Sequence, residues 1–254
     1  MLNKNNVVGV VLAGGEGKRL RPLTYYFQKC MIPIGNSQKP LLEYILVHLK
    51  RHDIVDVKLL VGYKQEQIVN YFNDGGRFGV KIDYFIDDPS LCGSGGALLN
   101  AAAKGAFSDA DVLLMYYGDI LSDIDLSEMV GQHVESESIA TLAVTNGFEV
   151  PVGVADIEGR SIKCWVEKPM IDIFAGIGIV ALSPVALRSL KELSIERKNT
   201  DIMGDLIPFL LKNGDRVEAY LTDAFWYDVG STEKYERIDN GLIDQLFNFP
   251  KIRM

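Results

Sequence analysis

Cysteine and long apolar runs are scarce in this chain. Only three cysteines occur among its 254 residues, at Cys30, Cys92 and Cys164. They are odd in number and widely separated, which excludes a metal-type cysteine pair and a disulfide framework and favours a reducing cytoplasm. No apolar run reaches the length of a membrane span, and the opening residues MLNKNN lack the apolar core of a signal peptide. We therefore expect a cytoplasmic protein without a membrane partner.

Positive charges are fewer than negative ones, and hexapeptide repeats are absent from the sequence. The chain has 26 Lys and Arg against 34 Asp and Glu, a net charge of -8, which argues against a nucleic-acid partner because such proteins present a basic surface. A local basic pocket is still compatible with this balance. No hexapeptide repeat is present, so we expect no C-terminal β-helix domain. The 48% hydrophobic content suits one large core, and we expect a single domain over residues 1–254.

Short apolar runs alternate with amphipathic stretches through the first half of the chain. Strands are expected at Val7–Ala13, Lys58–Val61, Val80–Ile86 and Val112–Tyr116, and helices at Leu41–Arg51, Gln65–Phe72 and Gly95–Lys104. The second half is richer in strands, at Ile139–Thr145, Val152–Asp156, Ile162–Glu167, Ala175–Leu182 and Arg216–Leu221, with helices at Pro184–Leu193, Met203–Lys212 and Thr232–Phe247. This order predicts an α/β fold with a Rossmann-like, mixed but mostly parallel sheet flanked by helices.

A glycine-rich turn follows the first expected strand. Gly14-Gly15-Glu16-Gly17 leads into four cations within one irregular loop, at Lys18, Arg19, Arg21 and Lys29. Glycine lets backbone N–H groups approach an anion, and the flanking cations neutralise its charge. A Walker A loop is excluded because Lys18 is followed by arginine, and a dinucleotide fingerprint because Leu20 replaces its third glycine. The pattern predicts a nucleoside triphosphate site at the carboxyl end of a strand.

Two aspartates stand where a strand ends or an apolar run is interrupted. Asp119 follows the expected strand Val112–Tyr116, so it shares the strand-end cleft with the glycine turn. Asp228 lies inside the run Phe225–Gly230, where a carboxylate is costly unless it is paired or bound to a metal. Magnesium prefers such carboxylate oxygens together with water and substrate phosphates.

These motifs together resemble the sugar-1-phosphate nucleotidyltransferases. GGEGKRLRPLT followed by QKCMIPIGNSQKPLLEYIL is similar to the opening motif of that family, which reads GGxGTRLxPLT and then PKPM. The similarity extends from Val7 to Arg237. It implies a nucleotidyltransferase-type α/β fold and the transfer of a nucleoside monophosphate from a triphosphate to a sugar-1-phosphate. It also implies a nucleotide-binding part at about 1–137 and a sugar-binding part, with the second metal ligand, at about 138–240.

The resemblance assigns roles to individual residues. Arg19, Lys29 and Lys168 would be catalytic cations, the first two on the triphosphate and the third on the sugar phosphate. The GD motif and the W-x-D-x-G motif would place Mg²⁺ on Asp119 and Asp228. The segments Pro151–Val154 and Val166–Pro169 would bind the sugar phosphate through Gly153, Glu167 and Lys168. The nucleotide-binding residues would be Leu12, Gly14, Gly15, Gly17, Asp88, Gly93 and Ser94.

Several residues depart from the family pattern. Gln28 and Cys30 replace the prolines that flank the lysine, so we expect a more mobile loop around Lys29. Lys18 replaces a threonine, and Ala175 replaces an asparagine that contacts the sugar.

The base and the sugar are predicted from a short acidic segment. An ionised carboxylate in Asp87-Asp88-Pro89 would accept from the two adjacent donors of guanine, and we assign that contact to Asp88. The segment GYKQEQIVNYFNDGGRFGVKIDYFIDD is similar to mannose- or heptose-1-phosphate guanylyltransferases, so GTP and mannose-1-phosphate are the expected substrates. A glucose-1-phosphate uridylyl-, thymidylyl- or cytidylyltransferase is the alternative within the family.

Two alternatives come from other classes. A glycosyltransferase could use the D-x-D formed by Asp123 and Asp125, although Asp125 or Ser127 would equally cap a helix. A non-catalytic regulatory subunit would have lost the charged set, which this chain retains. The sequence leaves a homo-oligomer open.

Overall fold

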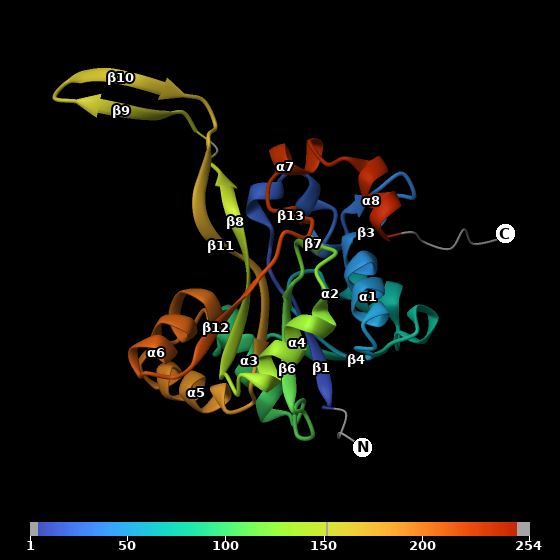
Figure 1. The fold of residues 1–254 in the computed structure, drawn as a ribbon. Coiled ribbons are helices and arrows are strands. Elements are labelled where there is room, and N and C mark those ends of the chain that lie inside the picture. The colour runs from blue at the N-terminus through green and yellow to red at the C-terminus, as the bar shows by residue number, and fades with distance from the viewer. Residues whose placement is uncertain (1–4, 151, 248–254) are drawn as a thin grey trace.

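A seven-stranded sheet forms the centre of the molecule (Figure 1). The computed structural model describes residues 5–150 and 152–247. The strand order is β12-β8-β11-β6-β1-β4-β5, and only β11 runs antiparallel to its two neighbours. The strands are β1 (Val7–Ala13), β4 (Asp56–Val61), β5 (Lys81–Ile86), β6 (Val112–Tyr117), β8 (Ala140–Glu149), β11 (Met170–Leu182) and β12 (Val217–Leu221). The predicted mixed, mostly parallel sheet is therefore confirmed.

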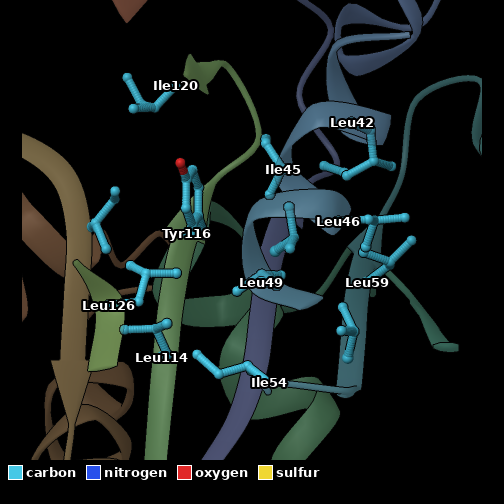
Figure 2. Packing of buried hydrophobic residues seen from close by; sticks show 14 of the residues in the cluster. Leu42, Ile45, Leu46, Leu49, Ile54, Leu59, Leu114, Tyr116, Ile120 and Leu126 are labelled. Atoms are coloured by element: carbon cyan, nitrogen blue, oxygen red, sulfur yellow. The ribbon is translucent and has the colours of Figure 1, made fainter. Parts of the chain in front are cut away.

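Helices cover both faces of this sheet. One face packs against α1 (Leu41–Arg51), α2 (Gln65–Phe72) and α4 (Leu126–Glu135), and the other against α3 (Gly93–Ala103), α5 (Ala186–Glu196) and α6 (Ile207–Lys212). Successive residues of β1 show why, because Val10 belongs to one buried cluster and Val11 to the other. Figure 2 shows the first cluster, which contains Leu46 and Leu49 of α1 together with Leu59 and Leu114 of the strands.

Three smaller pairs of strands complete the chain. They are β2 (Pro33–Ile34) with β3 (Lys39–Pro40), β7 (Ile120–Ser122) with β13 (Trp226–Asp228), and β9 (Val154–Glu158) with β10 (Ser161–Val166). The last pair, which we call the β9–β10 arm (residues 154–166), projects from the body of the molecule (Figure 1). The arm leaves the sheet where β8 ends and β11 begins. Since β8 runs parallel to β6 through β11, this is the edge at which β1 and β6 also end.

The remaining elements are short. Single turns of 3-10 helix lie at η1 (Lys18–Leu20), η2 (Leu23–Tyr25), η3 (Lys29–Met31) and η4 (Gly76–Phe78), and a π-helical turn η5 (Ile202–Leu206) precedes α6. In residues 5–150 and 152–247, no helix combines the length and the apolar character that crossing a membrane requires.

The structure corrects one predicted helix in particular. The expected helix Thr232–Phe247 is broken into α7 (Thr232–Glu236) and α8 (Asn240–Phe247). The break arises at Asp239, whose Oδ1 accepts a hydrogen bond of 2.9 Å from the Leu242 backbone N–H and so starts a new helix. The apolar spacing continues through the break, which is why periodicity alone missed it.

Candidate functional site

A cleft opens at the carboxyl ends of the central strands. Its volume is about 340 Å³, and residues that follow β1, β5 and β6 line it. Predicted and unpredicted residues meet there: Leu12, Gly14, Gly15, Gln28, Lys29, Cys30, Asp87, Gly93, Ser94, Tyr117 and Asp119. Ligands of open α/β sheets bind at this edge, so the position is the one expected for a nucleotide.

Lys29 and Asp119 form an ion pair within the cleft. The Lys29 ammonium contacts Asp119 Oδ2, and both side chains are largely buried. Lys29 reaches this place because it starts the turn η3, directly after a residue in extended conformation. A cation and a carboxylate, held together beside a glycine turn, are groups that can neutralise a phosphate and hold a metal ion.

Gln28 fixes the loop that carries Lys29. Its side chain is fully buried, its Nε2 donates to Ala13 O at 2.7 Å, and its Oε1 accepts from the Cys30 N–H at 2.5 Å. The backbone N–H of Gln28 donates to Gln67 Oε1 at 2.6 Å. Where a more mobile loop was expected, two of these bonds tie it to the end of β1 and to α2, and the third closes the turn within it.

Cys30 is an inert part of the cleft wall. Its thiol is buried, and this burial raises the pKa of Cys30 to about 12. A Cβ built on Gly118 would lie 2.6 Å from its sulfur, so the two residues pack closely. A thiol held neutral in this way is a packing group and not a nucleophile.

The glycine turn and Arg19 line a second cavity, of about 400 Å³, that meets the cleft at Lys29. Gly17 has a φ of 61°, a left-handed conformation that glycine adopts without strain. Of the loop's cations, Lys18 and Arg21 face Glu16, at 3.3 and 3.7 Å. Arg19 has no such carboxylate partner within the described residues, so its charge is free for an anion.

Asp228 lies on the strand beside Asp119. The strands β7 and β13 pair Ile120 with Asp228, and the Val229 N–H donates to Asp119 O at 2.8 Å. Oδ2 of Asp228 accepts from Lys234 Nζ at 2.6 Å. Its Oδ1 is buried and has no hydrogen-bond partner among the described residues.

The two aspartates fit a magnesium ion. A buried carboxylate oxygen without a partner is costly, and a hard cation would relieve that cost. In the part of the chain that the structure describes, no group of three or more His, Cys, Asp or Glu side chains is placed to hold a metal. Two carboxylates suit magnesium, because it usually keeps water and substrate phosphates as its other ligands.

Asp87, and not Asp88, faces the cleft. A Cβ on Gly14 would lie 2.2 Å from Asp87 Oδ2, so this carboxylate packs directly against the glycine turn. Burial raises the pKa of Asp87, and its Oδ1 is buried without a partner among the described residues. Asp88 instead uses its Oδ1 to accept from Ser90 N and Oγ, at 2.8 and 2.7 Å.

Gly93 and Ser94 begin α3 at the wall of the cleft. Gly93 has a φ of 82°, and a Cβ there would lie 2.3 Å from Thr200 O. The Ser94 hydroxyl donates to Asp201 Oδ2 at 2.7 Å and accepts from the Ile202 N–H at 2.8 Å. These contacts fix the start of α3 against the segment before η5.

The predicted sugar-binding residues lie at the base of the β9–β10 arm. Gly153 precedes β9, and Glu167 and Lys168 follow β10. None of the three lines the cleft or the cavity beside Arg19. A Cβ on Gly153 would lie 2.1 Å from the Trp165 ring, so this glycine packs under the indole. Pro151, part of the same predicted motif, lies outside the described residues.

The D-x-D segment contains the N-cap of a helix. Asp125 Oδ1 accepts from the Glu128 N–H at 2.9 Å and caps α4, as the structural interpretation of the motif predicted.

The sequence missed the cleft residues Gln28, Asp87 and Tyr117 as site residues, and it missed Lys234. Asp87 carried one usable signal, since it is the first residue after a strand. Lys234 carried none, because its contact with Asp228 depends on how α7 folds back.

Known proteins resemble this chain over most of its length. Residues 8–245 match the family model described as nucleotidyl transferase. A UTP–glucose-1-phosphate uridylyltransferase of Synechocystis sp. is 32% identical over 93% of this chain and 63% of its own length. A mannose-1-phosphate guanylyltransferase of Mycobacterium tuberculosis is 28% identical over 98% of this chain and 68% of its own. The chain thus spans about two thirds, or slightly less, of the length of these relatives.

A solved structure supports the same relationship. A putative glucose-1-phosphate thymidylyltransferase of Bacillus anthracis superposes with a TM-score of 0.75 at 26% identity, covering 95% of this chain and 99% of that one. The matched family model extends from β1, through the glycine turn and both aspartates, into α8. The chain belongs to the nucleotidyl transferase family.

Proposed function

We propose that this protein transfers a nucleoside monophosphate from a nucleoside triphosphate to a sugar-1-phosphate and releases pyrophosphate. The observation that carries the proposal is the Lys29–Asp119 pair, set between the glycine turn and the start of α3. The two cavities that meet at Lys29 supply room for a base on one side and a triphosphate on the other. The relatives, which transfer uridylyl or guanylyl groups to sugar phosphates by their names, support the same reaction class.

The reaction needs charge neutralisation more than acid–base chemistry. An oxygen of the sugar phosphate attacks the α-phosphorus of the triphosphate, and the bond from that phosphorus to the bridging oxygen breaks, so pyrophosphate leaves. The attacking oxygen is already an anion, so no general base is required. Arg19 and Lys29 bind the triphosphate and stabilise the charge that grows on pyrophosphate. Lys168 binds the incoming sugar phosphate.

Asp119 and Asp228 would hold magnesium, which would supply positive charge at the reacting phosphates. Its fit rests on the buried Oδ1 of Asp228, which has no partner in the described part of the chain, and on the adjacent backbone of Asp119. The charge balance of the site agrees, since a nucleotide brings more negative charge than Arg19 and Lys29 alone can offset.

The base that suits this cleft best is guanine. Asp87 lines the cleft, and its Oδ1 is buried with no hydrogen-bond partner among the described residues. Guanine offers two adjacent donors to such a group, whereas uracil and thymine flank a single N–H with carbonyl oxygens that an ionised carboxylate repels. We therefore propose GTP as the nucleotide, with Asp87 in the role that the sequence assigned to Asp88, and mannose-1-phosphate as the sugar.

The β9–β10 arm is placed to serve the sugar side. It leaves the sheet at the edge where β1 and β6 end, which is also the edge of the cleft. Glu167 and Lys168 at its base are the candidates for the sugar hydroxyls and the sugar phosphate. Because neither residue lines the cleft, this role requires the base of the arm to approach the cleft when substrate binds.

A pyrophosphate-release assay tests the reaction. The purified protein is given ATP, GTP, CTP, UTP or dTTP with mannose-1-phosphate or glucose-1-phosphate and magnesium. We expect pyrophosphate only when both substrates are present, and most of it from GTP with mannose-1-phosphate. No release from any pair would contradict the activity, and a preference for UTP or dTTP would contradict only the choice of base.

A matched pair of variants tests the base reader. Asp87→Asn should lower the ratio of kcat/KM for GTP over UTP by about tenfold or more, because a hydrogen bond to a charged group is lost. Asp88→Asn adds the same amide one residue away and should leave the ratio near wild type. The reverse ranking of the two variants would return the role to Asp88.

A further inference from the structure

Lys234 forms an ion pair with the carboxylate of Asp228. The side chain comes from α7, the short helix that follows the turn after β13, and its Nζ lies 2.6 Å from Asp228 Oδ2. The fold sets this contact, since Ser231 Oγ caps the Lys234 N–H at 3.3 Å and the Tyr227 hydroxyl donates to Lys234 O at 2.6 Å. Both the N–H and the carbonyl oxygen of Lys234 are therefore held by hydrogen bonds, which fixes the place from which its side chain starts.

The other prospective metal ligand carries an ammonium group as well. Lys29 pairs with Asp119 just as Lys234 pairs with Asp228. Two carboxylates on adjacent backbone segments repel each other when both are ionised, and one cation on each removes that repulsion. The metal-free site is thus held neutral by the chain itself.

The Lys234–Asp228 pair lies next to the phosphate side of the site. A Cβ on Gly230 would lie 2.5 Å from Asp228 Oδ1, so this carboxylate packs against Gly230. Gly230 in turn lines the cavity that contains Arg19 and Lys29. About half of the Lys234 side chain is exposed, at 47%, so its ammonium can leave Asp228 for water without a buried charge being stranded.

We infer that Lys234 is a positioning residue that neutralises Asp228 through Oδ2 and so competes with a divalent ion that would bind the same carboxylate at Oδ1. This inference rests on the proposed function, because it requires Asp228 to be a metal ligand. In the metal-free protein the ammonium holds the Asp228 carboxylate by its Oδ2. It also weakens the binding of a free metal ion, so the ion binds best together with the nucleotide that brings further phosphate ligands.

Binding of Mn²⁺ alone, without nucleotide, tests the inference by a readout other than turnover. The bound ion is measured by electron paramagnetic resonance or by calorimetry on the full chain. Lys234→Met should bind Mn²⁺ about threefold more tightly than wild type, because a half-exposed ion pair of ordinary strength no longer competes. Lys234→Arg restores a cation and should bind Mn²⁺ as wild type does.

Arg237→Met is the matched control. Arg237 follows the same helix and pairs with Glu233 at 2.9 Å, so its loss removes an equal charge without touching Asp228. Its Mn²⁺ affinity should stay near wild type. Equal tightening in Lys234→Met and Arg237→Met, or no tightening in Lys234→Met, would overturn the inference. Thermal unfolding in chelator checks that each variant folds, and Lys234→Gln replaces Lys234→Met if that variant does not.

Asp228→Asn separates the two ways of failing. It should weaken Mn²⁺ binding, and adding Lys234→Met to it should bring no tightening, since the competition has been removed. If Asp228→Asn binds Mn²⁺ as wild type does, Asp228 is not a metal ligand, and the metal part of the proposed function fails along with the inference. If Asp228→Asn weakens binding while Lys234→Met changes nothing, the inference alone is wrong.

Discussion

The cations of the glycine loop differ in what they contact. Lys18 and Arg21 face Glu16, Lys29 faces Asp119, and Arg19 has no carboxylate partner among the described residues. A cation already neutralised at the exposed surface adds little to a phosphate site. The structure thus distinguishes the cations of this loop by their partners, which the sequence alone did not reveal.

Removing either proposed triphosphate cation should abolish most turnover. Lys29→Ala and Arg19→Ala are each expected to lower kcat by roughly a hundredfold or more, since one preorganised charge contact is worth about 3–4 kcal/mol of barrier. Pyrophosphate release at saturating substrates measures the loss, and circular dichroism checks the fold. Lys18→Ala is the control and should keep its kcat within about twofold, because that charge is exposed and paired. Near-normal kcat in both Lys29→Ala and Arg19→Ala would contradict their roles.

Asp87 should make the stability of the ligand-free protein depend on pH. Burial raises the pKa of Asp87, so the folded state holds this proton more tightly than the unfolded state does. Stability then falls as pH rises from the ordinary range of an aspartate to the raised value, and the loss is complete above it. Asp87→Asn should therefore melt at a higher temperature than wild type at pH 8. The difference between the two melting temperatures should vanish toward pH 4, which is about the ordinary pKa of an aspartate.

Asp88 provides the control of opposite sign. Hydrogen bonds from Ser90, first from its backbone N–H, lower the pKa of Asp88. Asp88→Asn should therefore gain no stability at pH 8. Melting curves of wild type and both variants between pH 4 and pH 8 make the comparison, and a gain for Asp88→Asn with none for Asp87→Asn would contradict this assignment.

Among the elements, the β9–β10 arm is the one least tied to the core. No residue of the arm belongs to any of the three buried clusters of the described residues. Its apolar side chains face outward, with Ile157 61% and Trp165 58% exposed. Its contribution to the stability of the body should therefore be small.

Replacing residues 154–166 by a short Gly-Ser turn should separate stability from sugar binding. We expect a melting temperature close to that of wild type and unchanged nucleotide binding by calorimetry. We also expect the KM for the sugar phosphate to rise about tenfold or more, because the arm that positions Glu167 and Lys168 has been removed. A normal KM for the sugar phosphate in the shortened protein would remove the arm from the proposed site.

Periodicity and strand ends were enough to predict much of the molecule. The helix Leu41–Arg51 and the strand Val7–Ala13 lie where the apolar spacing predicted them, and the glycine turn and Asp119 follow strands as expected. The pairing of β7 with β13 was not predictable. It joins segments about a hundred residues apart, and neither is longer than three residues.

The placement of Asp87, rather than Asp88, on the cleft was not predictable for a related reason. Neighbouring residues after a strand point in different directions, and only the close approach of Gly14 and Gly62 decides which carboxylate is enclosed. That approach depends on how β1, β4 and β5 lie side by side, which no local pattern encodes.

At the scale of the whole molecule, the proposed metal site joins the two halves of the chain. Asp119 comes from the first half and Asp228 from the last strand, β13, so an ion between them links segments that only short strands otherwise pair. A ligand that binds the folded state alone stabilises it by mass action.

Magnesium with GTP should therefore raise the melting temperature. At ten times the dissociation constant the gain is about 1.4 kcal/mol, which for a chain of this size amounts to roughly 3–6 °C. Asp119→Asn and Asp228→Asn should each lose most of the magnesium-dependent part of this shift. Calorimetric melting in magnesium and in chelator makes the comparison. A magnesium-dependent shift as large as that of wild type in both aspartate variants would contradict the metal assignment.

The position of β11 also bears on how the protein is made. During synthesis β6, whose Val112–Tyr116 are all buried in the finished fold, emerges before its neighbour β11 has been translated. Until then β6 is an open apolar edge, which is a template for aggregation. A fragment of residues 1–137 should therefore accumulate in the insoluble fraction, whereas the full chain stays soluble, as sedimentation of the two lysates would show. The predicted nucleotide-binding part would then depend on the half translated after it for its solubility.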